Sequence, residues 1–60
     1  MWTVVYMAHN KVDANKIKEI LIQESFLVKL KGIGKEEDGV YEVLVPSGEA
    51  EEAHEVLVNL

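Results

Sequence analysis

The chain has 60 residues, no cysteine and a net charge of −5 at neutral pH. A domain of this size buries only about 60% of its unfolded surface, so its hydrophobic core is marginal. Without cysteines, disulfides and thiolate metal sites are excluded, and oligomerisation is the remaining common way to bury more surface. All six basic residues are lysines, and the lack of arginine together with the acidic balance argues against a nucleic-acid partner.

The charges are distributed unevenly along the chain. Residues 1–35 contain all six lysines and three acids, for a net charge of +3, whereas residues 36–60 contain eight acids and no lysine, for a net charge of −8. Contact between the two halves within one folded domain would neutralise much of this difference. Head-to-tail attraction between two subunits is the alternative that the sequence leaves open.

The first apolar run, residues 2–7, is rich in β-branched and aromatic residues and is typical of a strand. The run is too short to span a membrane, and it has neither a basic leader nor a small-residue cleavage site. We therefore expect a cytoplasmic protein that does not contact a membrane.

A helix is predicted to begin after Asn10. The side-chain oxygen of Asn10 can accept a hydrogen bond from a free amide at a helix N-terminus, and the Asp13 carboxylate favours the positive end of the helix dipole. An apolar stripe at helical spacing follows, formed by Ala14, Ile17, Ile20 and Leu21. The stripe predicts that this helix packs on a sheet.

Residues 26–31 are the second predicted strand, because their side chains alternate between two faces. One face holds Phe26, Val28 and Leu30, and the other holds Leu27, Lys29 and Lys31. Residues 32–39 are polar and bounded by glycines, which is typical of a hairpin loop. Residues 40–45 then return as the third predicted strand.

The register of this hairpin can be predicted from charge and burial together. If paired residue numbers sum to 71, Lys29 lies opposite Glu42 and Leu27 lies opposite Leu44 on one face. A slip by one residue would bury Lys29 and Glu42. We therefore expect this register.

A second helix is predicted after Pro46, which ends the third strand. Ser47 can cap this helix, and early acids complement its positive end. These acids are Glu49, Glu51 and Glu52, and the apolar stripe consists of Ala50, Ala53, Leu57 and Leu60, with Val56 beside it.

The element order β-α-β-β-α indicates a single α+β domain over residues 1–60. The crossover from the first strand to the second is expected to be right-handed, with the third strand inserted into or beside this pair. The predicted fold is a ferredoxin-like sandwich that lacks the final strand, with a three-stranded sheet and two helices on one face. Such a sheet keeps an open edge and an uncovered face.

The strand-to-helix turn is a candidate ligand site. His9, Asn10 and Lys11 combine free backbone amides with an ammonium group, which suits a carboxylate or phosphate. Ordinary helix capping explains the same residues equally well. A small anionic metabolite bound at residues 8–11, or at a subunit interface, is therefore our alternative functional hypothesis.

Catalytic and metal-binding patterns do not emerge from the remaining polar residues. Ser25 and Ser47 lack an identifiable base and orienting acid, so we do not expect an enzyme. His9 and His54 do not belong to a spacing that supplies three metal ligands, and the acids around His54 are typical of a solvated helix face. No cofactor and no metal are expected.

The three apolar strands exceed what two short helices can cover, which predicts self-association. Burial of each such side chain contributes about 1.5–3 kcal/mol before entropy costs. The predicted interface residues are Trp2, Val5, Met7, Leu27, Val40 and Leu44. Some of them would lie in the core if the faces of the first strand are reversed.

Four segments of the chain resemble a group of very short bacterial proteins, chiefly of Firmicutes. The segments are residues 1–6, residues 16–21, residues 26–29 and residues 43–46 followed by an acidic helix. This group is similar to a prokaryotic signal-transducing protein domain with a PII-like, ferredoxin-like fold. The resemblance covers nearly the whole chain and implies a homo-oligomer with the loop at residues 32–39 in the place of the long PII signalling loop.

The chain is shorter than PII and lacks the arginines and nucleotide-binding segments of that family. The leading hypothesis is therefore a non-enzymatic interaction or regulatory module that forms a homodimer or a larger closed oligomer through the face or the edge of its sheet. A further protein contact is expected through the loop at residues 32–39 or the acidic second helix, whose charge favours a basic partner surface.

Overall fold

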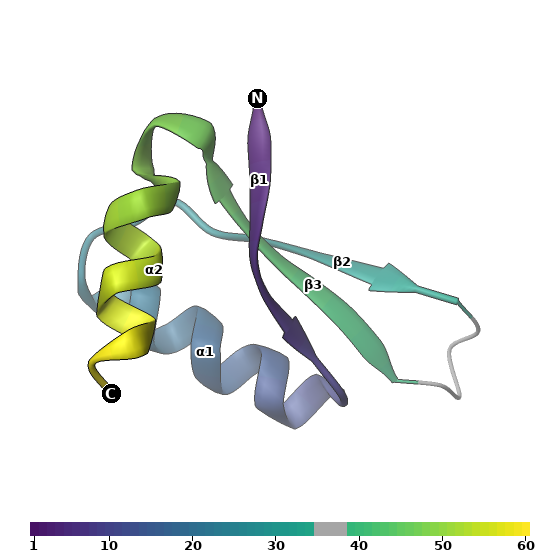
Figure 1. The fold of residues 1–60 in the computed structure, drawn as a ribbon. Coiled ribbons are helices and arrows are strands. Elements are labelled where there is room, and N and C mark those ends of the chain that lie inside the picture. The colour runs from purple at the N-terminus through teal and green to yellow at the C-terminus, as the bar shows by residue number, and fades with distance from the viewer. Residues whose placement is uncertain (35–38) are drawn as a thin grey trace.

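The fold was analysed in a computed structural model, and residues 1–34 and 39–60 are described (Figure 1). The strands are β1 (Trp2–Ala8), β2 (Lys29–Ile33) and β3 (Val40–Pro46). The helices are α1 (Lys11–Gln23) and α2 (Ala50–Val58), with a short 3₁₀ helix, η2 (Ser47–Glu49), before α2. Residues 35–38 belong to the predicted hairpin loop, so the centre of that loop lies outside the described residues.

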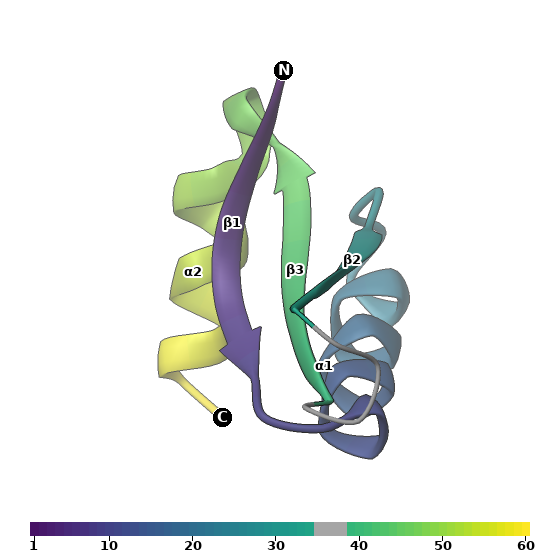
Figure 2. The same cartoon turned by 90° about the vertical axis from the view of Figure 1, so that its right-hand side faces the viewer.

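The strands form one antiparallel sheet in the order β1-β3-β2. β3 therefore lies between β1 and β2, as the inserted third strand of the predicted fold. Both helices lie behind the strands in Figure 2. The structure is α+β and matches a ferredoxin-like fold lacking one strand, which confirms the predicted fold class.

The core lies between the sheet and the two helices. It is built from side chains that are at most 5% exposed: Ile17 and Leu21 of α1, Val43 and Val45 of β3, and Ala53 of α2. The sequence pattern predicts these positions. A helix places every third or fourth side chain on one face, and a strand places every second side chain on one face. Phe26, Val28 and Leu30 pack against the same core, so the predicted faces of residues 26–31 are confirmed.

A β-bulge at Val5 interrupts the alternation of β1. Val4 is paired with Leu44 and Tyr6 with Val43, so Val5 is the extra residue of β1 between these two pairs. Val5 and Tyr6 both pack against the core, although they are neighbours in a strand. The prediction that Val5 lies on the uncovered face is therefore wrong, because the bulge turns it toward the helices.

The hairpin register differs from the predicted one by two residues. Lys29 is paired with Leu44, and Lys31 with Glu42. A slip by two leaves every side chain on its predicted face, and either register puts a lysine opposite Glu42, so the charge pattern could not separate them. The observed register places the Tyr41 ring over Gly32, where an added Cβ would lie 3.5 Å from a ring carbon.

The first helix begins as predicted and ends in a Schellman motif. The Asp13 amide donates to Oδ1 of Asn10 at 2.7 Å, which confirms the predicted cap. At the other end, the Phe26 amide donates to the Leu21 carbonyl at 3.0 Å and the Ser25 amide donates to the Ile22 carbonyl at 2.9 Å. Ser25 and Phe26 thus belong to the helix terminus, so β2 begins at Lys29 and not at Phe26.

Replacing Ser25 with glycine is expected to stabilise the fold by about 0.5–1 kcal/mol. Ser25 has a φ of 72°, in the left-handed region that costs a residue with a Cβ and that glycine adopts freely. Thermal unfolding followed by circular dichroism should show a midpoint about 2–8 °C higher than that of the wild type. Ser25→Ala retains the Cβ and serves as the control, and a Gly variant no more stable than the Ala variant would contradict this account.

The connection between β3 and α2 differs from its prediction. Ser47 makes no side-chain cap on α2, and its hydroxyl instead donates to the Met1 carbonyl at 3.0 Å and lies 2.7 Å from the Thr3 hydroxyl. The Ser47 amide also donates to the Met1 carbonyl, at 2.8 Å. These bonds hold the beginning of β1 against η2.

The predicted apolar stripe of α2 does not extend to Leu60. This residue lies past the end of α2 and is 70% exposed, so it does not continue the buried stripe of that helix.

Candidate functional site

The face of the sheet that points away from the helices is the candidate functional surface, and we call it the open face. The strand pairs arrange it in rows, in which Val4, Leu44 and Lys29 form one row and Met7, Glu42 and Lys31 the next. Trp2 and Pro46 lie at one end of these rows, and Ile33 and Val40 at the other. In Figure 2 the open face is turned toward the viewer.

Large apolar side chains on this face remain exposed to solvent. The exposed fractions are 43% for Trp2, 40% for Val4, 45% for Met7 and 37% for Ile33. Leu27 is 65% exposed and points away from the core, because its neighbours Phe26 and Val28 pack toward it, and Val40 is half-buried. Groups of this kind are typical of interaction surfaces when they are contiguous.

Leu44 lies at the centre of the open face and is only 9% exposed. On the same face, the Lys29 ammonium of β2 lies 5.6 Å from the centroid of the Trp2 ring of β1. A cation–π contact at this distance contributes about 0.5–1 kcal/mol at an exposed site. This contact therefore links side chains of β1 and β2, the two strands that flank β3.

Five of the six predicted interface residues lie on or beside the open face, and Val5 does not. Sequence reasoning missed Val4 and Ile33 on this face. For Val4 the cause is the bulge, since strict alternation with Val5 on the open face assigns Val4 to the core. For Ile33 the cause is its assignment to the loop, whereas β2 continues to this residue.

The charge of the open face differs from that of η2 and α2. It carries Lys29, Lys31 and a single acid, Glu42, whereas η2 and α2 carry four acids and no lysine, and α1 carries Lys11, Lys16 and Lys18 beside its acids. The acids on or next to the helices are Asp13, Glu19, Glu24, Glu49, Glu51, Glu52 and Glu55. Two copies of this acidic protein can therefore meet through their open faces with less repulsion than through α2.

The predicted anion site lies at the junction of β1 and α1. His9, Asn10 and Lys11 are exposed, and Asn10 uses its side-chain oxygen on the Asp13 amide, so one donor of this helix end is already satisfied. Gly39, with φ of 64°, lies close to this turn, and an added Cβ would be 3.5 Å from the His9 carbonyl oxygen. The turn and the end of the hairpin loop are thus neighbours, and anion binding here stays a prediction.

Tyr6 links β1 to the first turn of α1. Its hydroxyl donates to Oδ2 of Asp13 at 3.0 Å. This hydrogen bond raises the pKa of Tyr6 above its ordinary value of 10.0, and burial and the Asp13 charge act in the same direction. Tyr6 therefore stays a neutral hydrogen-bond donor at physiological pH and connects β1 to the first turn of α1.

The remaining polar residues do not assemble into a catalytic or metal site within the described ranges 1–34 and 39–60. No three histidine, aspartate or glutamate side chains of these ranges lie close enough together to hold a metal ion. His9 lies at the β1–α1 turn, whereas His54 is an exposed residue of α2. The two histidines therefore belong to separate parts of the fold.

Among the described residues, neither helix combines the length and the apolar character needed to cross a membrane. No protein-family model matches the chain, and no curated protein and no solved structure is significantly similar to it. The resemblance to the PII-like signal-transducing domain therefore stays a prediction.

Proposed function

We propose that this protein is a non-enzymatic regulatory module that acts as a homodimer, with the two open faces packed against each other. The observation that supports this proposal most directly is the group of exposed apolar side chains around Leu44. Trp2, Val4 and Met7 are each 40–45% exposed there, and a sheet face of this kind is otherwise a liability for a dissolved monomer.

Charge supports a second copy as the occupant. In a symmetric pair the same surface meets itself, so Lys31 of one copy can approach Glu42 of the other and the reverse pair forms as well. The acidic helix α2 of each copy then points outward, where repulsion between the two copies is screened by solvent. A standard interface buries about 800 Å² per partner, which is about a fifth of the 4233 Å² of accessible surface of this chain.

Packing through the open face is favoured over pairing through the β1 edge of the sheet. β1 is an edge strand, and α2 contacts it from the helix side. The bulge at Val5 twists β1 and breaks its regular ladder, which is a common way in which edge strands avoid pairing with another chain. The apolar surface is moreover on the face and not on the edge.

The regulatory part of the proposal draws on the resemblance to PII-like domains and on the surfaces that dimerisation leaves free. A dimer formed through the open faces exposes both pairs of helices and both hairpin ends for contact with another protein. The absence of a catalytic constellation among the described side chains is compatible with a binding role. Signal transduction through such contacts is the function we propose.

The native mass of the purified wild-type protein tests this proposal. We expect a dimer of twice the 6.8 kDa chain mass, without additional mass. Native mass spectrometry should be combined with a dilution series by analytical ultracentrifugation, which measures the dissociation constant. A monomer at all concentrations would contradict the proposal, and a reproducible extra mass of a small anion would favour the alternative site at residues 8–11.

A further inference from the structure

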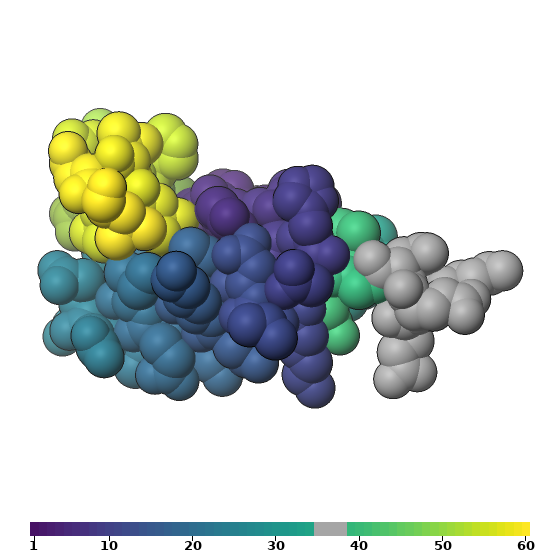
Figure 3. All heavy atoms as spheres, turned by 90° about the horizontal axis from the view of Figure 1, so that it is seen from below, coloured from purple at the N-terminus to yellow at the C-terminus, as the bar shows by residue number. Residues whose placement is uncertain are grey.

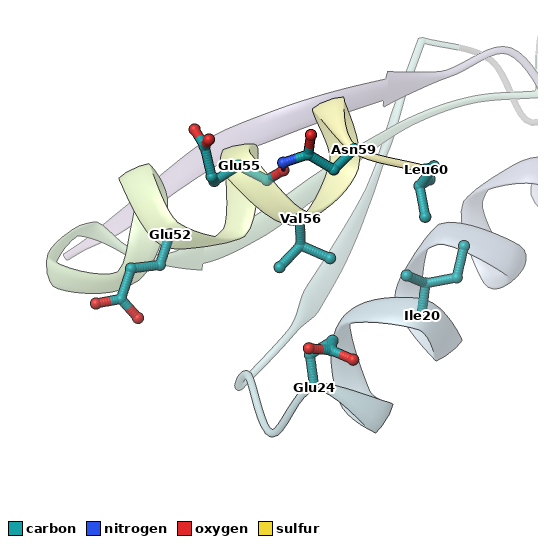
Figure 4. A pocket seen from close by; sticks show the side chains of 7 residues that line it. All are labelled: Ile20, Glu24, Glu52, Glu55, Val56, Asn59 and Leu60. Atoms are coloured by element: carbon teal, nitrogen blue, oxygen red, sulfur yellow. Dashed lines mark hydrogen bonds between the residues drawn. The ribbon is translucent and has the colours of Figure 1, made fainter.

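A groove runs between α1 and α2, on the opposite side of the molecule from the open face. It has a volume of about 510 Å³ and is lined by Ile20, Glu24, Glu52, Glu55, Val56, Asn59 and Leu60. Figure 4 shows Val56 and Leu60 pointing from the α2 side toward α1, with Ile20 facing them from α1. Most of the exposed surface in the groove is apolar.

The rim of the groove is negatively charged. Glu24 lies at the α1 end, and Glu52 and Glu55 project outward from α2, while none of the lining residues is basic. Both helix C-caps, Glu24 and Asn59, line the groove, so the partial negative charges of the two helix termini add to those of the carboxylates. The groove is therefore apolar at its floor and attractive to cations at its edges.

Glu24 lies at the C-terminus of α1, where its negative charge lowers the stability of the fold. A carboxylate at a helix C-terminus is repelled by the helix dipole, and neither helix has a basic residue in its last turn to compensate. Residues that break a local rule without a structural gain concentrate at functional sites. The unfavourable position of Glu24 is an observation independent of the shape of the groove.

The shape of the groove identifies the kind of occupant. All of its lining residues come from α1, α2 and their ends, so it has two walls and stays open along its length. Figure 3 shows α2 (yellow) and α1 (blue) against each other at one end of the molecule, with the start of β3 (green) extending away from them. A small molecule would keep much of its surface in water in such a groove, whereas a third helix can pack along both walls.

We propose that the groove between α1 and α2 docks a basic amphipathic helix of a partner protein. Apolar side chains of that helix, spaced at i, i+3, i+4 and i+7, would contact Ile20, Val56 and Leu60. Lysines or arginines beside this stripe would approach Glu24, Glu52 and Glu55. The groove lies away from the open face, so docking is independent of dimerisation and one proposal can fail without the other.

The test uses a designed 18-residue peptide of leucine and lysine with a helical apolar stripe, labelled for fluorescence anisotropy. We expect binding to the wild-type protein that weakens as salt is added, and no binding of the matched peptide with glutamate in place of lysine. Glu24→Lys should weaken binding at least tenfold while raising the thermal midpoint, because the new lysine complements the helix dipole. A loss of binding in this variant therefore cannot come from unfolding.

Two further variants complete the design. Glu19→Lys changes the charge of α1 equally but does not line the groove, so its affinity should stay within twofold of that of the wild type. Leu60→Ser removes an apolar contact from a residue that is already 70% exposed and should weaken binding several-fold. Equal affinities of the Glu24→Lys and Glu19→Lys variants, or no binding at about 1 mM peptide, would overturn the proposal.

Self-docking is the remaining outcome of the same experiment. If the groove held a second copy of this chain, the wild type would form species larger than a dimer that Glu24→Lys dissociates. That result would overturn the assignment of the groove to another protein. An unchanged dimer mass with peptide bound in the groove would support it.

Discussion

Met7→Lys is expected to convert the dimer into a folded monomer. Met7 lies on the open face, and burial of such a side chain at an interface contributes about 1.5–3 kcal/mol. A symmetric dimer loses this contribution twice and has to bury two lysines, so dissociation should become easier by about 3 kcal/mol or more, at least about a hundredfold in the dissociation constant. Sedimentation velocity over a dilution series measures this change.

The fold should tolerate this substitution. Met7 is 45% exposed in the monomer and lies opposite Glu42 in the sheet, so a lysine at this position gains an oppositely charged cross-strand neighbour. The free energy of unfolding of the monomer, measured in urea, should differ little between this variant and the wild type.

Ile22→Lys is the matched control for Met7→Lys. Ile22 is 46% exposed and belongs to α1, on the helix side of the molecule. The substitution changes the net charge by the same amount, so a purely electrostatic effect on dimerisation would appear in both variants. The role of the open face would be refuted if Met7→Lys left the dissociation constant of the dimer unchanged. It would also be refuted if Ile22→Lys raised that constant by the same factor as Met7→Lys.

Leu21→Ala is expected to unfold most of the protein at low concentration. Leu21 is fully buried, and removing a buried leucine side chain costs about 2–5 kcal/mol because a cavity remains. A domain of this size has a total stability of about 3–9 kcal/mol, so the loss is a large fraction of it. Urea unfolding followed by the fluorescence of Trp2, the single tryptophan, measures this loss.

The same variant links folding to dimerisation. If the dimer is the folded species, mass action predicts that the folded fraction of Leu21→Ala rises with protein concentration. Ile22→Ala removes a similar side chain from the neighbouring exposed position and should cost less than about 1 kcal/mol. A cost of Leu21→Ala no greater than that of Ile22→Ala would contradict the position of Leu21 in the core.

The sequence alone predicted the features that depend on neighbouring residues. The spacing of Ala14, Ile17 and Leu21 predicted the buried stripe of α1, and Asn10 predicted its cap. The alternation of residues 26–31 predicted which of these side chains face the core. Such patterns are local, because the period of a helix or strand decides which side chains share a face.

The tertiary structure decided the features that depend on contacts between distant segments. The bulge at Val5 and the hairpin register follow from how β1 and β2 fit against β3, and two registers satisfied the local pattern equally well. Ser47 bonds to Met1 and Thr3, 46 and 44 positions away, in place of capping α2. The groove between α1 and α2 arises only when both helices pack on the sheet, since long-range packing, and not local preference, sets their distance.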